Sequence, residues 1–219
     1  MHLVMNLSGA YEEQGFMPAS SESLDLRGVE GTSCYCDPDA ADAIRAAIAG
    51  FPASMVHWID SGDYHYITLF WMERIEEPFA LLLLDNHPDD QSCAFGDSIL
   101  SCGSWVRHAR EELPMLRHVC TVRRRSDPLD IPEGLPVYVS LDKDVMSRDF
   151  ARTDWDQGDL TLEEVKARIA EAAASRRVIG VDVCGEIDAS KGGCGEDVEI
   201  NLKTNVELAE FLVTLRDKY

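Results

Sequence analysis

The stretch Leu81-Leu-Leu-Leu84-Asp85-Asn-His87-Pro-Asp89-Asp90 passes directly from an uninterrupted apolar run into acidic residues and a histidine. A short run that is apolar throughout, rather than alternating with polar residues, is typical of a parallel strand covered on both faces. In open parallel sheets, ligands bind beyond the carboxyl ends of the strands. The stretch therefore predicts a buried strand with a polar site at its end.

Apolar runs of the same kind recur along the chain, separated by segments with helical patterning. The runs are Leu3–Leu7, Met55–Ile59, Phe79–Leu84, Val119–Val122, Val137–Leu141 and Val178–Val183. Helices are indicated by Asp37-Pro38 before Ala40–Ala49, by the capping-box sequence Thr161–Glu164, and by the helical spacing of apolar residues in Asn205–Arg216. The alternation predicts a single α/β domain over residues 1–219, with a doubly wound, mostly parallel β-sheet and helices on both faces.

Composition limits the classes of partner. The net charge of −20, from 40 acidic and 20 basic residues, argues against nucleic acid and against an anionic membrane surface. No apolar run approaches the ~20 residues of a membrane span, and Met1–Leu7 lacks the features of a signal peptide, so we expect a soluble, cytoplasmic protein. The scattered, odd number of cysteines favours reduced thiols. They are Cys34, Cys36, Cys93, Cys102, Cys120, Cys184 and Cys194.

The spacing of the acidic residues predicts a metal site. Like Asp85, His87 and Asp89, the pair Asp142 and Asp144 directly follows an apolar run. Residues two apart in extended backbone project to the same side, so each set can face one site. Such carboxylates repel one another unless cations neutralise them. Donors dominated by oxygen suit manganese or another hard divalent ion better than zinc, and these donors are too many for one ion. The alternative is that each acid caps a helix or begins a turn.

These motifs resemble those of the arginase-like (ureohydrolase) superfamily. Asp85-Asn-His87-Pro-Asp89 resembles the Asp-Ala-His-x-Asp signature of arginases, agmatinases and formimidoylglutamases, and Ser140-Leu-Asp142-Lys-Asp144 resembles their Ser-x-Asp-x-Asp signature. Ser61-Gly-Asp63-Tyr-His65 is similar to the segment with their first metal-binding histidine, but it has one extra residue, so Tyr64 stands at the expected ligand position and His65 comes one later. The resemblance covers about residues 55–190 and implies a three-layer α/β/α fold with two divalent ions, manganese being expected. The implied ligands are His65, Asp85, His87, Asp89, Asp142 and Asp144.

The resemblance also implies further site residues, at positions where the chain departs from the pattern. Asp182-Val-Cys-Gly-Glu186 is similar to the late strand whose glutamate meets the guanidinium, so Glu186 is the candidate for substrate binding; the alternative is a turn carboxylate. Cys102 stands where the family has a proton-relaying histidine, and His108 follows it. Both are catalytic candidates together with Asp144, although a surface position on a helix is the alternative for His108.

The implied function is hydrolysis of a C–N bond in a guanidino or amidino group by a metal-bound hydroxide. The expected substrate is a cationic small molecule or peptide, arginine-like, because some arginase-like proteins act on arginine within peptides and this chain is short. Two alternatives stay open: a zinc-dependent amide deacetylase on the same fold, and a non-catalytic metal-stabilised binding protein. The oligomeric state is also open, a homo-oligomer included.

Overall fold

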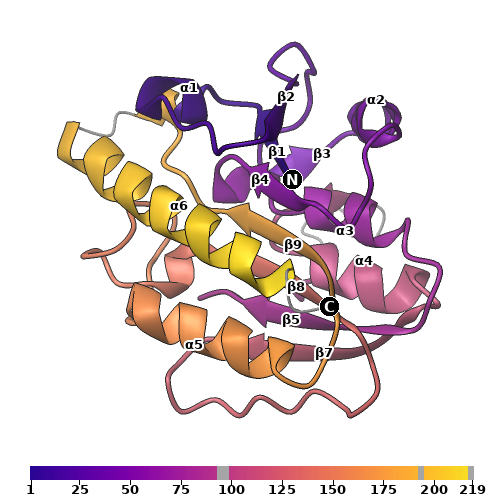
Figure 1. Cartoon of the computed structure of the whole chain (residues 1–219). Helices are drawn as coiled ribbons and strands as arrows, with labels where there is room; N and C mark the ends of the chain where they lie inside the picture. The colour runs from indigo at the N-terminus through magenta and orange to yellow at the C-terminus, as the bar shows by residue number, and fades with distance from the viewer. Residues whose placement is uncertain (93–98, 192–194, 217–219) are drawn as a thin grey trace.

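The computed structural model describes residues 1–92, 99–191 and 195–216 (Figure 1). Within this part, seven parallel strands form one sheet in the order β2-β1-β4-β9-β8-β5-β7. They are β1 (His2–Asn6), β2 (Ser21–Asp25), β4 (Val56–Ile59), β5 (Phe79–Leu84), β7 (Leu116–Val122), β8 (Val137–Asp142) and β9 (Val178–Cys184). Each of the six apolar runs overlaps a strand of this sheet, and the strand of this sheet that was not predicted is β2, at its edge.

Helices cover both faces of the sheet, which confirms the predicted doubly wound α/β architecture (Figure 1). They are α1 (Ala10–Gln14), α2 (Pro38–Ile48), α3 (Ile67–Met72), α4 (Trp105–Glu112), α5 (Leu162–Ala173) and α6 (Gly195–Arg216). In β5, Leu82 belongs to the core shared with α1, α5 and α6, whereas Leu83 belongs to the core shared with α2, α3 and α4. Successive residues of a strand point to opposite faces, so an apolar run supplies both cores at once.

The helix boundaries follow local signals in part. The capping box before α5 is present: the Thr161 hydroxyl accepts from the Glu164 N–H at 3.2 Å, and the Thr161 N–H donates to the Glu164 carboxylate at 3.0 Å. Helix α6 begins at Gly195, well before the predicted start at Asn205. Its first turns bury polar residues such as Asn201 rather than apolar ones, so apolar periodicity does not mark them.

A small antiparallel sheet lies beside the polar end of the main sheet. It pairs β3 (Tyr35–Cys36) with β6 (Leu100–Ser101), and the Cys102 N–H donates to the Cys34 carbonyl at 2.8 Å. This pairing brings two segments that are far apart in sequence to the same place, next to the loops that follow β4 and β5.

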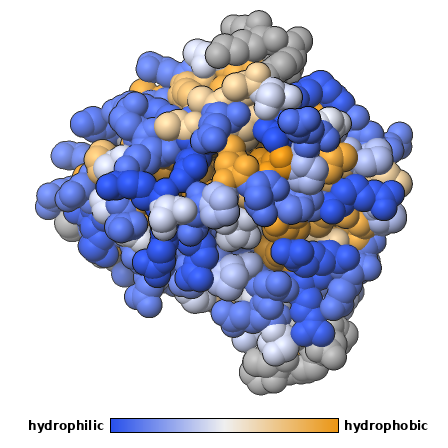
Figure 2. Space-filling model, turned by 90° about the horizontal axis from the view of Figure 1, so that it is seen from below, coloured by the Kyte–Doolittle hydropathy of each residue, from blue (hydrophilic) through white to orange (hydrophobic). Residues whose placement is uncertain are grey.

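The surface agrees with the acidic composition: the face in Figure 2 is largely hydrophilic, with apolar groups exposed between polar ones. None of the helices within the described ranges is long and apolar enough to cross a membrane. Five cysteines are free thiols, as expected: Cys34, Cys36, Cys102, Cys120 and Cys184. Cys93 and Cys194 lie outside the described residues.

Candidate metal centre

The carboxyl ends of two neighbouring strands bring the two acidic motifs together. Strands β5 and β8 pair in parallel with Leu84 opposite Leu141. The next residues, Asp85 and Asp142, therefore meet at the carboxyl ends of these strands. After β8, the chain turns into a short 3₁₀ helix in which the Asp142 carboxylate accepts from the Asp144 N–H at 2.9 Å. This hydrogen bond turns the chain so that Asp144 lies near the end of β5. There the Asp144 carboxylate also accepts a hydrogen bond from the Asn86 N–H at 2.9 Å.

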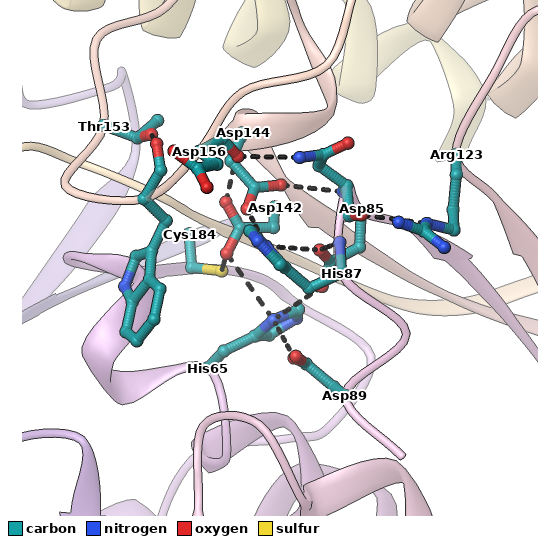
Figure 3. Close-up of polar contacts among 12 residues, drawn as sticks. His65, Asp85, His87, Asp89, Arg123, Asp142, Asp144, Thr153, Asp156 and Cys184 are labelled. Carbon is teal, nitrogen blue, oxygen red and sulfur yellow. Dashed lines mark hydrogen bonds and ion pairs between the residues drawn. The ribbon is translucent and has the colours of Figure 1, made fainter. Parts of the chain in front are cut away.

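His65 reaches the same place despite its shifted position in the sequence. Gly62–Tyr64 form a 3₁₀ helix after β4, and the His65 N–H donates to the Gly62 carbonyl at 3.1 Å. This tight turn takes up the additional residue and directs the buried His65 ring inward, with Nδ1 3.0 Å from Asp89 Oδ2 and 3.2 Å from Asp85 Oδ2 (Figure 3). Nε2 of the ring is 2.8 Å from the Ser140 hydroxyl, which fixes the ring orientation.

His87 lies on the opposite side of Asp85. Its Nδ1 is 2.7 Å from Asp144 Oδ2 and 3.8 Å from Asp85 Oδ1, and its side chain is half-buried at the wall of a cavity. The hydrogen bond to Asp144 raises the pKa of His87. The two oxygens of Asp85 therefore face different histidines, Oδ2 towards His65 and Oδ1 towards His87.

The carboxylates of this cluster are buried close together without enough positive charge to keep them all ionised. Burial, followed by the charges of Asp89 and Asp144, raises the pKa of Asp85 well above its usual range. Burial and the charge of Asp144 raise the pKa of Asp142 to about 7. Without a counter-charge, these carboxylates take up protons rather than remain ionised together.

Two atoms at the centre of the cluster are not used in hydrogen bonds and could bind a metal ion. His65 Nδ1 and Asp85 Oδ2 are buried and lie 3.2 Å apart, but neither forms a hydrogen bond of acceptable geometry. An unsatisfied buried polar atom costs about 1–3 kcal/mol, so a cation that accepted both atoms would remove a penalty. Two groups of donors, each within 4.8 Å, are suited to holding an ion: His65 with Asp85 and Asp89, and His87 with Asp85 and Asp144. The residues present therefore fit two divalent ions that share Asp85.

A cavity of about 310 Å³ opens onto the cluster. Besides the metal-site carboxylates and His87, its lining includes Cys34, Tyr35, Gly62, Gln91, Ser101, Cys102, Gly103 and Trp155. The Trp155 ring is edge-on to the His87 ring, with centroids 6.0 Å apart, and its Nε1 donates to Asp63 at 3.1 Å. Sequence patterns did not indicate a role for Trp155, because it lies in the loop before α5 and belongs to none of the metal-ligand motifs.

Glu186, the predicted substrate-binding residue, does not line this cavity. The carboxylate is fully buried and accepts from Lys143 Nζ, Asn205 and Gln14, the latter two at 2.7 and 2.6 Å. Gly185 has a φ of 88° and lies so close to Asp142 that an added Cβ would be 2.3 Å from Asp142 Oδ1. The chain therefore turns at Gly185 and sends Glu186 beneath the site as the counter-ion of Lys143.

The two candidates for proton transfer outside the metal cluster are placed differently. His108 does not line the cavity; its Nδ1 is 2.8 Å from Glu112 one turn along α4, so the structure does not bring it to the metal cluster. Cys102 does line the cavity. Burial, followed by the charge of Cys34, raises the pKa of the Cys102 thiol above its usual range, so the thiol keeps its proton at neutral pH.

No family model matches the sequence. A protein from Thermotoga maritima, described only as uncharacterized, is 28% identical over 200 residues, covering 84% of this chain and 79% of that protein.

Solved structures share the fold. Proclavaminate amidino hydrolase from Streptomyces clavuligerus matches with a TM-score of 0.67 and 16% identity, over 98% of this chain and 91% of that chain. Arginase from Medicago truncatula matches with a TM-score of 0.66 and 16% identity, over 95% of this chain and 85% of that chain. A triple mutant of T. brucei arginase-like protein bound with Mn²⁺ matches with a TM-score of 0.63 and 13% identity, over 98% of this chain and 90% of that chain. The chain therefore has the arginase-like three-layer α/β/α fold, as its motifs implied.

Proposed function

We propose that this chain is a hydrolase that cleaves a C–N bond in a guanidino or amidino group with two divalent metal ions, of which manganese is the expected one. The observation that carries the proposal is the pair of histidine–carboxylate groups that share Asp85 at the base of a cavity. His65 Nδ1 and Asp85 Oδ2 support it, because both are buried, face each other at 3.2 Å and form no hydrogen bond of acceptable geometry, so an ion can take their lone pairs. The T. brucei arginase-like structure bound with Mn²⁺ supports the choice of metal.

The chain offers a complete set of ligands for both ions. His65, Asp85, Asp89 and Asp142 would hold one ion, and Asp85, His87 and Asp144 would hold the other. Carboxylate oxygens dominate both sets, which suits hard divalent ions. When bound, two such ions would supply hydroxide near neutral pH, because divalent ions lower the pKa of water to about 7.

Trp155 replaces Glu186 as our candidate for binding the cationic group of the substrate. Its indole ring forms the wall of the cavity next to His87. A planar guanidinium stacks favourably on such a ring, and the carboxylates at the base of the cavity add attraction for a positive charge. The volume of about 310 Å³ is at the lower end of the ~300–1,000 Å³ usual for ligand pockets. It suits a small arginine-like molecule or one arginine side chain of a peptide.

Proton transfer to the leaving amine falls to groups at the cavity. Asp144 is held in place by the Asn86 N–H and faces His87 with its second oxygen, so we retain it as a candidate. Cys102 keeps its proton and can donate a hydrogen bond to a leaving nitrogen, whereas it cannot serve as a base.

The proposal is tested by loading the protein with Mn²⁺ and measuring urea, or the equivalent product, from free arginine, agmatine and an arginine-containing peptide. We expect release from at least one substrate, loss of release in His87→Ala, and unchanged release in His118→Ala, a histidine on β7 that does not line the cavity. Release of acetate from an acetylated amine instead would favour a deacetylase. A protein that binds two ions and turns over neither class would be a binding protein.

A further inference from the structure

Cys184 lies against the metal centre, although the metal-ligand motifs do not include it. It is the last residue of β9, pairs with Asp142 of β8 across the sheet, and is fully buried. Its Sγ is 3.3 Å from Asp142 Oδ2 (Figure 3). The donor atoms of His65, Asp142 and Cys184 all lie within 4.8 Å of one another.

A second observation concerns His65 Nδ1, the nitrogen donor in the group of His65, Asp142 and Cys184. His65 Nδ1 is buried and forms no hydrogen bond of acceptable geometry, although it lies 3.0 Å from Asp89 Oδ2 and 3.6 Å from Asp142 Oδ2, the oxygen next to Cys184. The opposite nitrogen of the same ring is held by Ser140. A zinc-like ion binds sulfur at ~2.3 Å and histidine nitrogen at ~2.0–2.1 Å, so two donors of one ion lie at most about 4.4 Å apart. The spacing of the three donors therefore needs little movement to enclose one ion.

The two halves of the metal centre differ in chemical character. The group of Asp85, His87 and Asp144 offers only oxygen and nitrogen, whereas His65 belongs to two groups, one with Asp85 and Asp89 and one with Asp142 and the thiol of Cys184. Thiolate ligands select softer ions than carboxylates do. A centre with one sulfur-containing half therefore has an intrinsic preference for two different metals.

We propose that Cys184 is a direct thiolate ligand of the ion in the His65 half, so that this half prefers Zn²⁺, Co²⁺ or Fe²⁺ while the His87 half prefers an oxygen-seeking ion such as Mn²⁺. The inference rests on the proposed two-metal centre and refines its metal identity. On binding, the S–H bond breaks, its electron pair forms the bond to the ion, and the proton passes to solvent. The Asp142 oxygen that accepts the thiol hydrogen bond in the structure is the first acceptor on that path.

Cobalt provides the test, because a thiolate bound to Co²⁺ gives a near-ultraviolet charge-transfer band that carboxylates and imidazoles do not. The wild type and Cys120→Ser, which removes a buried free thiol from β7, should both show the band on Co²⁺ titration. Cys184→Ser should lack the band while still holding two Mn²⁺ ions by elemental analysis. Its Zn²⁺ affinity should fall by at least about 10–100-fold, the loss already seen when groups next to metal ligands are removed.

X-ray absorption of the Zn²⁺-loaded wild type tests the same point without the variant, in case Cys184→Ser does not fold. We expect a sulfur neighbour at ~2.3 Å from the metal, retained in Cys102→Ser and Cys34→Ser, the other thiols at the cavity. A wild type that binds two ions without a sulfur neighbour or a charge-transfer band would refute the thiolate ligand and leave the proposed function intact. A wild type that binds no divalent ion would refute the two-metal proposal itself.

Discussion

The substitution Glu186→Gln separates a structural role from a role in substrate binding. Glu186 and Lys143 are both fully buried, and the carboxylate also accepts hydrogen bonds from the side-chain amides of Gln14, Asn201 and Asn205. Glutamine would leave the Lys143 charge without a counter-ion. It would also direct its own N–H groups at neighbours that are already donors.

The expected loss of stability is large. Removing one partner of a buried ion pair costs about 3–5 kcal/mol. For a domain of this size, about 1 kcal/mol shifts the melting temperature by roughly 2–4 °C, so Glu186→Gln should melt about 6–20 °C below the wild type. Adding Lys143→Met should recover part of the loss, because it removes the unpaired charge.

Thermal and urea unfolding of the metal-free protein measure this effect, with Glu77→Gln as the matched control. Glu77 pairs with Arg177 at the surface, where both side chains are about half exposed, and such pairs contribute less than about 1 kcal/mol. If Glu186→Gln melted like the wild type and raised KM for an arginine-like substrate, the reasoning about Lys143 would be wrong.

Three further predictions concern the metal centre and the cavity. Because the folded pKa of Asp142 is about 7, above its unfolded value of 3.8, the metal-free protein should lose stability as pH rises from about 4 through 7. Saturating Mn²⁺ should abolish that loss in melting curves, and rising stability without metal would contradict the assignment. Trp155→Ala should raise KM by roughly 5–30-fold with little change in kcat, corresponding to about 1–2 kcal/mol for a cation on an indole face; a fall in kcat alone would argue against stacking. Finally, kcat/KM should fall as salt rises, because the charge of −20 attracts a cationic substrate, and a salt-independent rate would exclude that contribution.

The central strands could be predicted from sequence because each is buried on both faces and is therefore apolar throughout, as in Phe79–Leu84. The same reasoning missed β2, where Ser21, Glu22 and Ser23 lie at the sheet edge and stay partly exposed. It also shortened α6, because the turns before Asn205 bury polar residues such as Asn201, which donates to Glu186.

The site could be predicted where local spacing controls geometry. Asp85 and Asp142 follow neighbouring strands, so strand order alone brings them together. Spacing could not reveal the positive φ of Gly185, which turns Glu186 away from the cavity. Nor could it place Trp155, which reaches the site through tertiary packing with Asp63.

Asp142-Lys143-Asp144 serves two regions of the molecule at once. The two aspartates face the cavity, while the lysine between them extends to the opposite side and donates to Asn205 of α6 at 3.0 Å. Ions bound by Asp142 and Asp144, as proposed, would therefore restrain the backbone that anchors helix α6. Amide hydrogen exchange in α6 should consequently slow when the metal centre is filled, which gives a readout of metal occupancy far from the metals themselves.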